Sequence, residues 1–586
     1  MFKYHITVFI AVFSAFVIFE AKAVKASPHP VDYIQEDGSV IRIRLHGDEH
    51  FNYATDESGA ILILNEKGIY EYAVLNDKGI VVGSGINALH NLSGADIKPL
   101  YSMQQAVSTE RFKRKKISTR AASEDETTKL YRYSTSAFPT IGEPHSVVIL
   151  VAYPDYGFSL DDPKKYFEEF LNGENFIDKG ATGSVRKYYI ENSCGQFVPT
   201  FDVYGPIMLK NNRRYYGGGY ETKACEMVVE AVEALDAEVD FSQYDHNEDG
   251  YVDSIYIIYA DRGEADGGPA ESVWPYSWEL EEEGIILEAD GVKFNTYGVS
   301  NELKSDGIIE GIGTFTHEFG HVLGLPDLYN TEKYNDYSTP LDWSVMDSGN
   351  YNNDSRTPCN LSSFERYSLG WLSPEEIVST GAYCVDQLAV TNKAFIMTTE
   401  EKPDEFFLME YRVKEGWDEY LPAQGMLIWH IDFNQNLWDW NTPNNVKDHH
   451  RVDLVRADNI KDRKTLEDDV FPANGKDEFS TVTEPALKSW NGSALNVIKI
   501  SKIKEENDAM SFQAEVTEDR TPPTTGIDLP QDDSIIYLSG NILYSRLGAY
   551  SVFDITGRNC GIVSPASPVA LPKGLYIVNG KKYFIR

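Results

Sequence analysis

Alternating apolar and polar positions divide the chain into segments with different patterns. Residues 24–108 hold short β-type runs, such as VIRIRL and AILILN, between Gly, Asp and Asn turns, which predict a small β unit. From about Tyr131, strands alternate with helices, and beyond Trp371 aromatic-rich strands dominate to about Val516, which suggests a β-sandwich. The last residues predict another small β unit. A length of 586 residues with 42% hydrophobic content suits several folded units.

The central segment has an α/β order. Apolar runs predict buried strands at 146–154 (SVVILVAYP) and 253–260 (DSIYIIYA). Periodic apolar positions and capping residues predict helices at 160–172, 183–193 and 222–238.

The first residues combine Lys3, an apolar run from Ile6 to Phe19 and the small-residue pattern Ala21-Lys22-Ala23. This pattern predicts a cleavable secretory signal, because the run is shorter than the roughly 20 apolar residues that a membrane span needs. No later stretch is apolar enough for a transmembrane segment. The basic run 111–127 predicts an exposed linker open to trypsin-like proteases, and a solvated charge run without a processing role is the alternative.

Charge and cysteine content narrow the possible classes of protein and partner further. The formal net charge of -38 repels phosphate backbones, so we expect no nucleic acid partner. No cysteine precedes Cys194, which excludes a lipid-modified N-terminal cysteine. The five cysteines have no paired spacing, and their connectivity cannot be read from the sequence.

Residues 313–329, GTFTHEFGHVLGLPDLY, carry the strongest chemical signal. Positions four apart share a helix face, so His317 and His321 can bind one Zn²⁺ while Glu318 reaches a water on the metal. Gly324 can end the helix and Pro326 cannot continue it, which frees Asp327 to turn back toward the ion. Two ordinary histidines on a core helix are the alternative.

These residues resemble the immune inhibitor A-like zinc peptidases, relatives of the metzincins, whose motif is H-E-x-x-H-x-x-G-x-x-D. The family's methionine turn matches DWSVMDSGNYN, with Met346 at its centre, and the resemblance covers about residues 130–515. It implies a secreted zinc endopeptidase with an α/β (α+β) metzincin-like domain, a mixed twisted sheet and an active-site helix. In such an enzyme His317, His321 and Asp327 bind zinc, Glu318 is the general base, and Gly324 and Met346 give structural support.

A rival arrangement within zinc chemistry takes a glutamate from a later helix as the third ligand, and Glu365 in LSSFERY is the candidate. We favour Asp327, because Gly324 and Met346 have no role in the rival arrangement.

The stretch DHNEDGYVD predicts a calcium loop. Oxygen donors at alternate positions around Gly250 suit Ca²⁺, although Tyr256 stands where an EF-hand has its bidentate glutamate. The proposed ligands are Asp245, Asn247, Asp249, Tyr251 through its carbonyl, and Asp253. A plain acidic turn is the alternative.

The two ends also resemble known segments. The N-terminal β unit resembles bacterial propeptides, in which a carboxylate such as Asp48 could block the zinc, and a turn aspartate is the alternative. The tail is similar to the C-terminal sorting domains of the type IX secretion route in Bacteroidetes, so we expect the secretion machinery as a partner and a location outside the cell or at its surface. A small β adhesion or spacer module is the alternative for this tail.

The expected division is a signal peptide at 1–23, a propeptide at 24–121, a zinc peptidase domain at 122–375, a β-sandwich domain at 376–517, a linker at 518–532 and a sorting domain at 533–586. The sequence thus predicts a zymogen of a protein-cleaving enzyme. A surface binding or adhesion protein on a metallopeptidase scaffold that no longer cuts is the alternative.

Overall fold

The computed structural model describes residues 22–89, 131–518 and 536–585, apart from short gaps. The gaps are 36, 49–51, 66, 76–80, 218–222, 270, 333–337, 400, 540–541, 546–549, 555–558, 564–568, 572–573 and 579–580. Most of the predicted signal and the whole basic run 111–127 therefore lie outside the described residues. Contacts divide the chain into two compact units, Met1–Asp519 and Arg520–Arg586.

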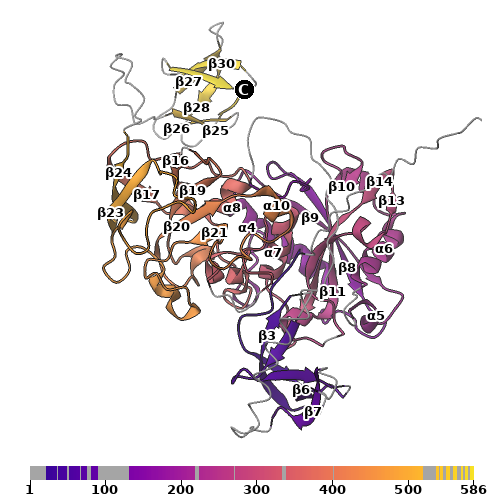
Figure 1. Ribbon diagram of the computed structural model, residues 1–586. Coiled ribbons are helices and arrows are strands. Elements are labelled where there is room, and N and C mark those ends of the chain that lie inside the picture. Colours follow the sequence, from indigo (N-terminus) through magenta and orange to yellow (C-terminus); the bar gives the residue numbers. More distant parts are fainter. Residues whose placement is uncertain are drawn as a thin grey trace, which may run out of the picture. The chain divides into compact units, whose positions relative to one another are not determined.

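A six-stranded sheet forms the centre of the first unit, in the order β1-β12-β15-β11-β8-β9 (Figure 1). Four of its strands run parallel: β8 (His145–Ala152), β9 (Thr200–Met208), β11 (Ile255–Arg262) and β15 (Thr296–Leu303). The strand β12 (Tyr276–Glu279) is antiparallel to β15, and the short β1 (Lys22–Ala23) pairs with its other side. The two strands predicted at 146–154 and 253–260 are confirmed as β8 and β11.

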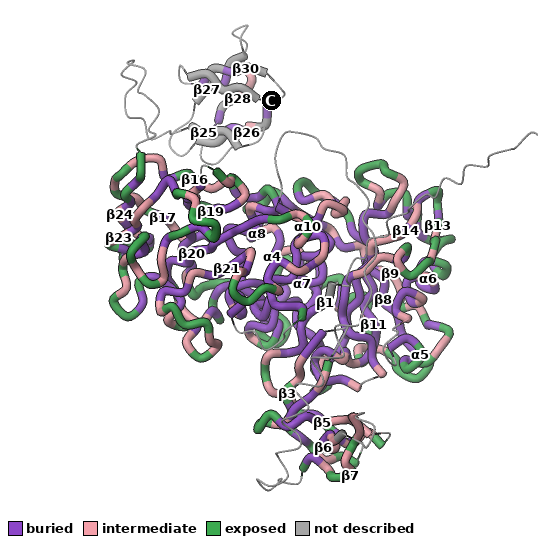
Figure 2. The backbone as a smooth tube through the Cα atoms, viewed as in Figure 1, coloured by how far each residue is buried: buried purple, intermediate pink, exposed green. Residues whose placement is uncertain are grey.

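Helices cover both faces of this sheet because its strands are apolar on both sides. Val148 and Leu150 of β8 share a cluster with α3 (Pro163–Asn172), α4 (Val185–Asn192) and α7 (Ile312–Val322). Val147, Ile149 and Val151 lie in a second cluster with α6 (Ala224–Leu235). The three helices predicted from periodicity are confirmed, as α3, α4 and α6. The domain is mixed α/β, with α7 buried along its length (Figure 2).

Smaller elements complete this region. The short strand β10 (Tyr251–Val252) pairs with β14 (Val292–Phe294), which pairs in turn with β13 (Leu287–Ala289). Because β10 comes first, the acidic stretch that begins at Asp245 does not lead directly into β11. The helices α5 (Arg213–Gly217) and α8 (Ser363–Ser368) are short.

The N-terminal residues form an antiparallel six-stranded sheet in chain order. Its strands are β2 (Val31–Ile34), β3 (Val40–Gly47), β4 (Asn52–Thr55), β5 (Ile61–Leu64), β6 (Tyr70–Leu75) and β7 (Val81–Asn87). Alternating burial along β3, where Ile41 and Ile43 are buried, follows the period of two expected of a strand with one covered face.

Two further sheets follow the central domain and share one apolar cluster. The five-stranded sheet contains β16 (Glu375–Glu376), β18 (Phe395–Thr398), β19 (Glu405–Arg412), β20 (Gly425–Asp432) and β21 (Val452–Leu454). The four-stranded sheet contains β17 (Gly381–Asp386), β24 (Ala509–Val516), β23 (Val497–Glu506) and β22 (Phe479–Ser480). The short helices α9 (Leu388–Thr391) and α10 (Gln435–Asp439) interrupt this region.

The second unit, considered by itself, contains a three-stranded and a four-stranded sheet. Its strands are β25 (Ile536–Ser539), β26 (Ile542–Ser545), β27 (Tyr550–Asp554), β28 (Asn559–Val563), β29 (Val569–Ala570), β30 (Gly574–Val578) and β31 (Lys581–Ile585). Cys194, Cys225, Cys359 and Cys384 are free thiols in the structure. Among the described residues, we find no helix with both the length and the apolar character needed to cross a bilayer.

Candidate metal centre

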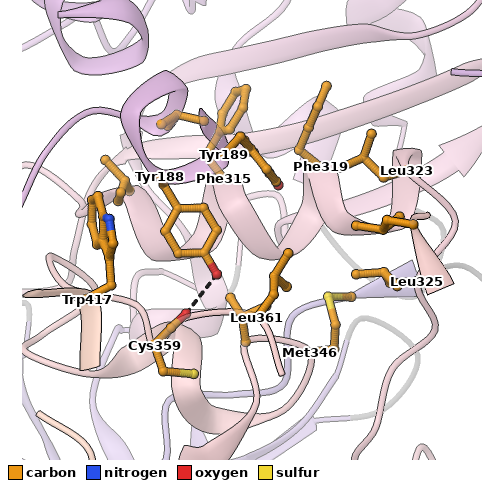
Figure 3. Packing of buried hydrophobic residues seen from close by; sticks show 14 of the residues in the cluster. Tyr188, Tyr189, Phe315, Phe319, Leu323, Leu325, Met346, Cys359, Leu361 and Trp417 are labelled. Atoms are coloured by element: carbon orange, nitrogen blue, oxygen red, sulfur yellow. Dashed lines mark hydrogen bonds between the residues drawn. The ribbon is translucent and has the colours of Figure 1, made fainter. Parts of the chain in front are cut away.

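Helix α7 is held against the sheet by its aromatic face. The ring of Phe315 lies 4.1 Å from that of Tyr256 on β11, and the ring of Phe319 lies 5.2 Å from that of Phe201 on β9. Figure 3 shows Phe315 and Phe319 along the helix, with Tyr189 of α4 beside them. Since this face is fixed by packing, the positions of the polar residues on α7 are fixed as well.

His317 and His321 project one turn apart from α7, and both are buried. The Nδ1 atom of His317 lies 2.8 Å from the carbonyl oxygen of Val345, and that of His321 lies 2.8 Å from the carbonyl oxygen of Leu325. These contacts orient both rings so that each Nε2 atom points away from the carbonyl that contacts Nδ1. A backbone carbonyl on Nδ1 is the usual way in which a metal-binding histidine is held.

Asp327 is brought to the same place. Its Oδ1 atom lies 3.1 Å from Nε2 of His317 and 3.4 Å from Nε2 of His321. The candidate ligand atoms of the three residues lie within 4.8 Å of one another. His317 Nε2 and Asp327 Oδ1 are buried without a hydrogen bond of acceptable geometry. Buried polar atoms left in this way fit a shared metal ion, and two imidazoles with one carboxylate suit zinc.

The chain reverses between the second histidine and Asp327 as the glycine and proline suggested. Gly324 has a φ of +103°, and a side chain there would meet the Cβ atom of Arg132 at 2.9 Å. Tyr133 donates its N–H to the Gly324 carbonyl at 2.8 Å. The residue must therefore be glycine both for its backbone angle and for the close approach of the neighbouring chain.

Asn441, which lies between α10 and β21, holds Asp327, a contact that the sequence did not indicate. Its Nδ2 group donates to Asp327 Oδ2 at 2.6 Å, and its Oδ1 atom accepts the Asp327 N–H at 2.7 Å. The Tyr133 hydroxyl also donates to this Oδ1 at 2.8 Å. Burial alone would raise the pKa of Asp327, but the His321 and His317 imidazoles hold the pKa below its ordinary value.

Met346 lies beneath α7 at a point where the helix has no side chain. Its sulfur atom lies 2.7 Å from the position that a Cβ atom on Gly320 would take. Its carbonyl accepts the N–H of Leu328 at 2.8 Å, and its N–H donates to Ser344 Oγ at 3.0 Å. The methionine turn thus supports both α7 and the segment that carries Asp327.

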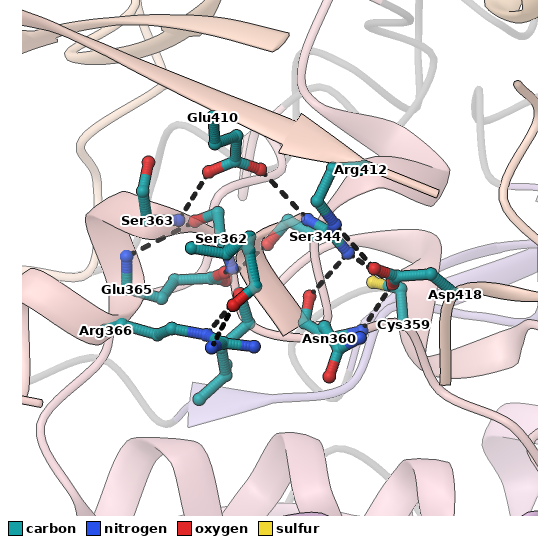
Figure 4. A network of polar contacts seen from close by, with 12 residues as sticks. Ser344, Cys359, Asn360, Ser362, Ser363, Glu365, Arg366, Glu410, Arg412 and Asp418 are labelled. Atoms are coloured by element: carbon teal, nitrogen blue, oxygen red, sulfur yellow. Dashed lines mark hydrogen bonds and ion pairs between the residues drawn. The ribbon is translucent and has the colours of Figure 1, made fainter. Parts of the chain in front are cut away.

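Glu365, the rival third ligand, lies elsewhere. It belongs to the capping box of α8, where Ser362 is the N-cap residue. Its carboxylate accepts the Ser344 hydroxyl and the Ser362 N–H, both at 2.6 Å (Figure 4). The structure therefore uses Glu365 to tie α8 to the methionine turn and does not bring it to the two histidines.

A buried ion-pair network lies around Glu365. Arg412 contacts Asp418 and lies 3.1 Å from Glu410, whose carboxylate accepts the Ser363 N–H (Figure 4). Arg412 and Glu410 belong to β19, so this network joins α8 to the sheet that follows the central domain.

Glu318 already has a contact from the N-terminal end of the chain. Its Oε1 atom accepts the N–H of Val24 at 2.7 Å, and both residues are buried. Trp274 donates its indole N–H to the Val24 carbonyl at 2.8 Å. A backbone segment thus reaches the carboxylate of Glu318 through the Val24 N–H.

The predicted calcium loop is closed by its own hydrogen bonds. Asp245 accepts the N–H groups of Asp249 and Gly250, and Gly250 has a φ of +88°. Asn247 Oδ1 also accepts the Asp249 N–H, and Asp249 Oδ1 accepts that of Tyr251. Asp253 Oδ2 is turned to Nδ1 of His246 at 2.8 Å. Within the described part of the chain, these acidic residues do not converge as a metal-binding group in the way that His317, His321 and Asp327 do.

The central part of the chain is similar to known peptidases. Residues 151–373 match the family model described as the catalytic domain of immune inhibitor A peptidase M6. Immune inhibitor A of Bacillus thuringiensis subsp. alesti is 27% identical over 231 residues, which are 34% of this chain and 33% of that protein. Pre-pro-metalloprotease PrtV of Vibrio cholerae serotype O1 (strain M66-2) is 30% identical over 210 residues, 31% of this chain and 22% of that protein.

The match thus spans a third or less of the length of either relative. The matched region contains the two histidines, Glu318, Asp327 and Met346. Residues 151–373 are similar to the M6 peptidase catalytic domain, and the comparisons support a metalloprotease.

Proposed function

We propose that the chain is the zymogen of a secreted zinc endopeptidase. His317, His321 and Asp327 would hold the ion, which when bound supplies Lewis acidity and a water of lowered pKa. The observation that carries the proposal is the convergence of these three buried side chains beside the buried carboxylate of Glu318.

Glu318 would act as the general base. Its carboxylate takes a proton from the attacking water and passes it to the nitrogen of the breaking peptide bond. The geometry favours this role, because Oε1 already contacts a peptide nitrogen, that of Val24, at 2.7 Å.

The test replaces Glu318 by Gln in the processed enzyme. We expect the variant to keep its zinc by elemental analysis while casein hydrolysis falls by roughly two or more orders of magnitude. A chelator should abolish the wild-type activity, and zinc should restore it. If the zinc-loaded variant still cuts casein, Glu318 is not the general base.

The same measurement distinguishes the proposed peptidase from the alternative, a binding protein that no longer cuts. The chain has the proposed base, Glu318, and all three proposed ligands, His317, His321 and Asp327. A protein without catalytic activity need not keep these residues. Wild-type protein that holds zinc and cuts no protein substrate would support the alternative.

Latency would come from the N-terminal segment. If a signal peptide is removed after Ala23, the nitrogen at Glu318 becomes the α-amino group of the proenzyme. The name of the PrtV relative describes that protein as a pre-pro-metalloprotease, which supports the same order here. N-terminal sequencing of the active secreted form should find a start between Arg111 and Arg120, and full activity with a start near Ser27 would contradict the zymogen.

Two further expectations remain proposals from the sequence. The first is calcium binding by Asp245, Asn247, Asp249, Tyr251 and Asp253. The second is export through a type IX sorting domain at 533–586. The loop has the necessary oxygen atoms and turn, which supports the first. Calcium titration of the Asp249→Ala variant tests it, with loss of a calcium-dependent rise in Tm as the expected result. Deletion of residues 533–586 should retain the protein inside the cell if the second is right.

A further inference from the structure

The N-terminal segment is held beside Glu318 by contacts to its backbone. Before removal of the predicted signal peptide, the strand β1 lies antiparallel to β12, with Lys22 opposite Ser277 and Ala23 opposite Tyr276. Beyond it, Trp274 donates to the Val24 carbonyl at 2.8 Å and the Tyr351 hydroxyl donates to the Lys25 carbonyl at 2.6 Å. Contacts of this kind do not depend on side-chain identity, so a substrate peptide can reuse them.

The contact with Glu318 fixes the register of this segment. In the proposed reaction Glu318 passes a proton to the leaving nitrogen, so the peptide nitrogen at Oε1 occupies the place of that atom. This nitrogen belongs to Val24. Val24 therefore occupies the position directly after the scissile bond, and Lys25 occupies the second position.

Lys25 reaches the buried carboxylate of Asp347. Its Nζ atom lies 3.8 Å from Oδ1 of Asp347, and the two side chains are 10% and 0% exposed. The same Nζ atom lies 5.6 Å from the centre of the Tyr329 ring. A carboxylate and an aromatic face beside one ammonium group form a site for a cation.

Asp347 is fixed in place by neutral donors. Its Oδ2 atom accepts the Leu341 N–H at 2.8 Å, and its Oδ1 atom accepts the Ser348 hydroxyl at 3.1 Å. These hydrogen bonds orient the carboxylate and leave its negative charge in place. A buried charge of this kind is costly without a cation, and departure of the propeptide removes Lys25 from it.

We propose that Asp347 and Tyr329 form a specificity subsite that selects lysine or arginine at the second residue after the scissile bond. The inference rests on the proposed peptidase function. After activation, a basic side chain of the substrate takes the place of Lys25, and its charge pairs with Asp347 in a largely desolvated position. We expect such a peptide to be cut at least about tenfold more efficiently than one with a neutral side chain of similar length.

The experiment uses the processed wild-type enzyme and two measurements. Cleavage sites in denatured casein are mapped by mass spectrometry, and kcat/KM is measured for quenched peptides that carry Lys, Gln or Glu at the second position after the mapped bond. The expected results are enrichment of Lys and Arg at that position and the order Lys, then Gln, then Glu. Casein cleavage without enrichment, or equal kcat/KM for Lys and Gln, would overturn the subsite and leave the peptidase standing. Absence of any cleavage would overturn both.

Variants assign the preference to Asp347. We expect Asp347→Asn to reduce the Lys to Gln ratio of kcat/KM to near one. The matched control is Asp342→Asn, five residues earlier, whose carboxylate lies 2.9 Å from Arg463 and which should keep most of the preference. If Asp347→Asn does not fold, the peptide series on the wild-type enzyme still decides the proposal. An unchanged ratio in folded Asp347→Asn would contradict it.

Discussion

The backbone nitrogen of Val24 lies 2.7 Å from Oε1 of Glu318, although 294 positions separate these residues in the chain. The adjoining carbonyl accepts the indole N–H of Trp274. The proposed base is thus occupied by the N-terminal segment of the chain itself. Latency would accordingly depend on main-chain contacts of Val24.

Weakening one of these contacts should loosen the proposed proenzyme. Trp274→Phe keeps an aromatic ring but removes the donor to Val24, a hydrogen bond that contributes about 1 kcal/mol. We expect the unprocessed chain to hydrolyse a quenched peptide several times faster than wild type, because the segment leaves Glu318 more often. The rate is measured while a gel still shows only the full-length chain.

Trp278→Phe is the matched control on the same edge of the sheet. Its indole donates to Glu283 at 3.0 Å. Equal rates for the two unprocessed variants would show that the Trp274 contact does not hold the propeptide.

The Glu318 contact could not be foreseen from the sequence, because a backbone N–H has no residue signature. In contrast, the spacing of His317 and His321 fixes their common helix face, and Gly324 with Pro326 predicts the reversal that brings Asp327 back. Helix periodicity likewise predicted α3, α4 and α6 within a few residues. The order of the six strands depends on pairing between distant segments, which local patterns do not encode.

The choice between Asp327 and Glu365 can be decided by metal content. We expect Asp327→Ala to weaken zinc binding by roughly an order of magnitude or more and to abolish turnover, since its Oδ1 atom faces both imidazoles. Glu365→Gln should keep near wild-type zinc, because that carboxylate is bonded to Ser344 and Ser362. Bound zinc is measured by elemental analysis after identical dialysis, and the reverse pattern would move the third ligand to Glu365.

Asn441 should act as a positioning residue for the metal. It holds both the backbone and the carboxylate of Asp327, and groups of this kind typically change metal affinity by about 10- to 100-fold. We expect Asn441→Ala to lower zinc affinity in that range in a competition titration with a chelating dye. Asn445→Ala is the control, because its side chain bonds to Thr331 instead. Equal affinities for the two variants would exclude the role.

Asp469 should make stability depend on pH. It is buried, it lies 3.7 Å from Arg456, and it accepts the Trp343 indole N–H at 2.9 Å. Burial raises the pKa of Asp469 from 3.8 to about 7, against the opposing effects of Arg456 and Trp343. Because the raised pKa belongs to the folded state, the folded chain binds a proton that the unfolded chain releases between these two values. The contribution of this group to the free energy of unfolding therefore falls as pH rises through that window, by up to about 4 kcal/mol, and is constant above it.

Asp469→Asn should remove this dependence. An amide oxygen still accepts the Trp343 N–H and cannot ionise, so the variant resembles the protonated wild type. We expect the Tm of the variant to be close to that of wild type near pH 4.5 and several degrees higher near pH 8. Glu467→Gln, two residues earlier and exposed, controls for the loss of one negative charge. A Tm difference that is the same at both pH values would show that the folded chain keeps Asp469 ionised, with Arg456 as its counterion.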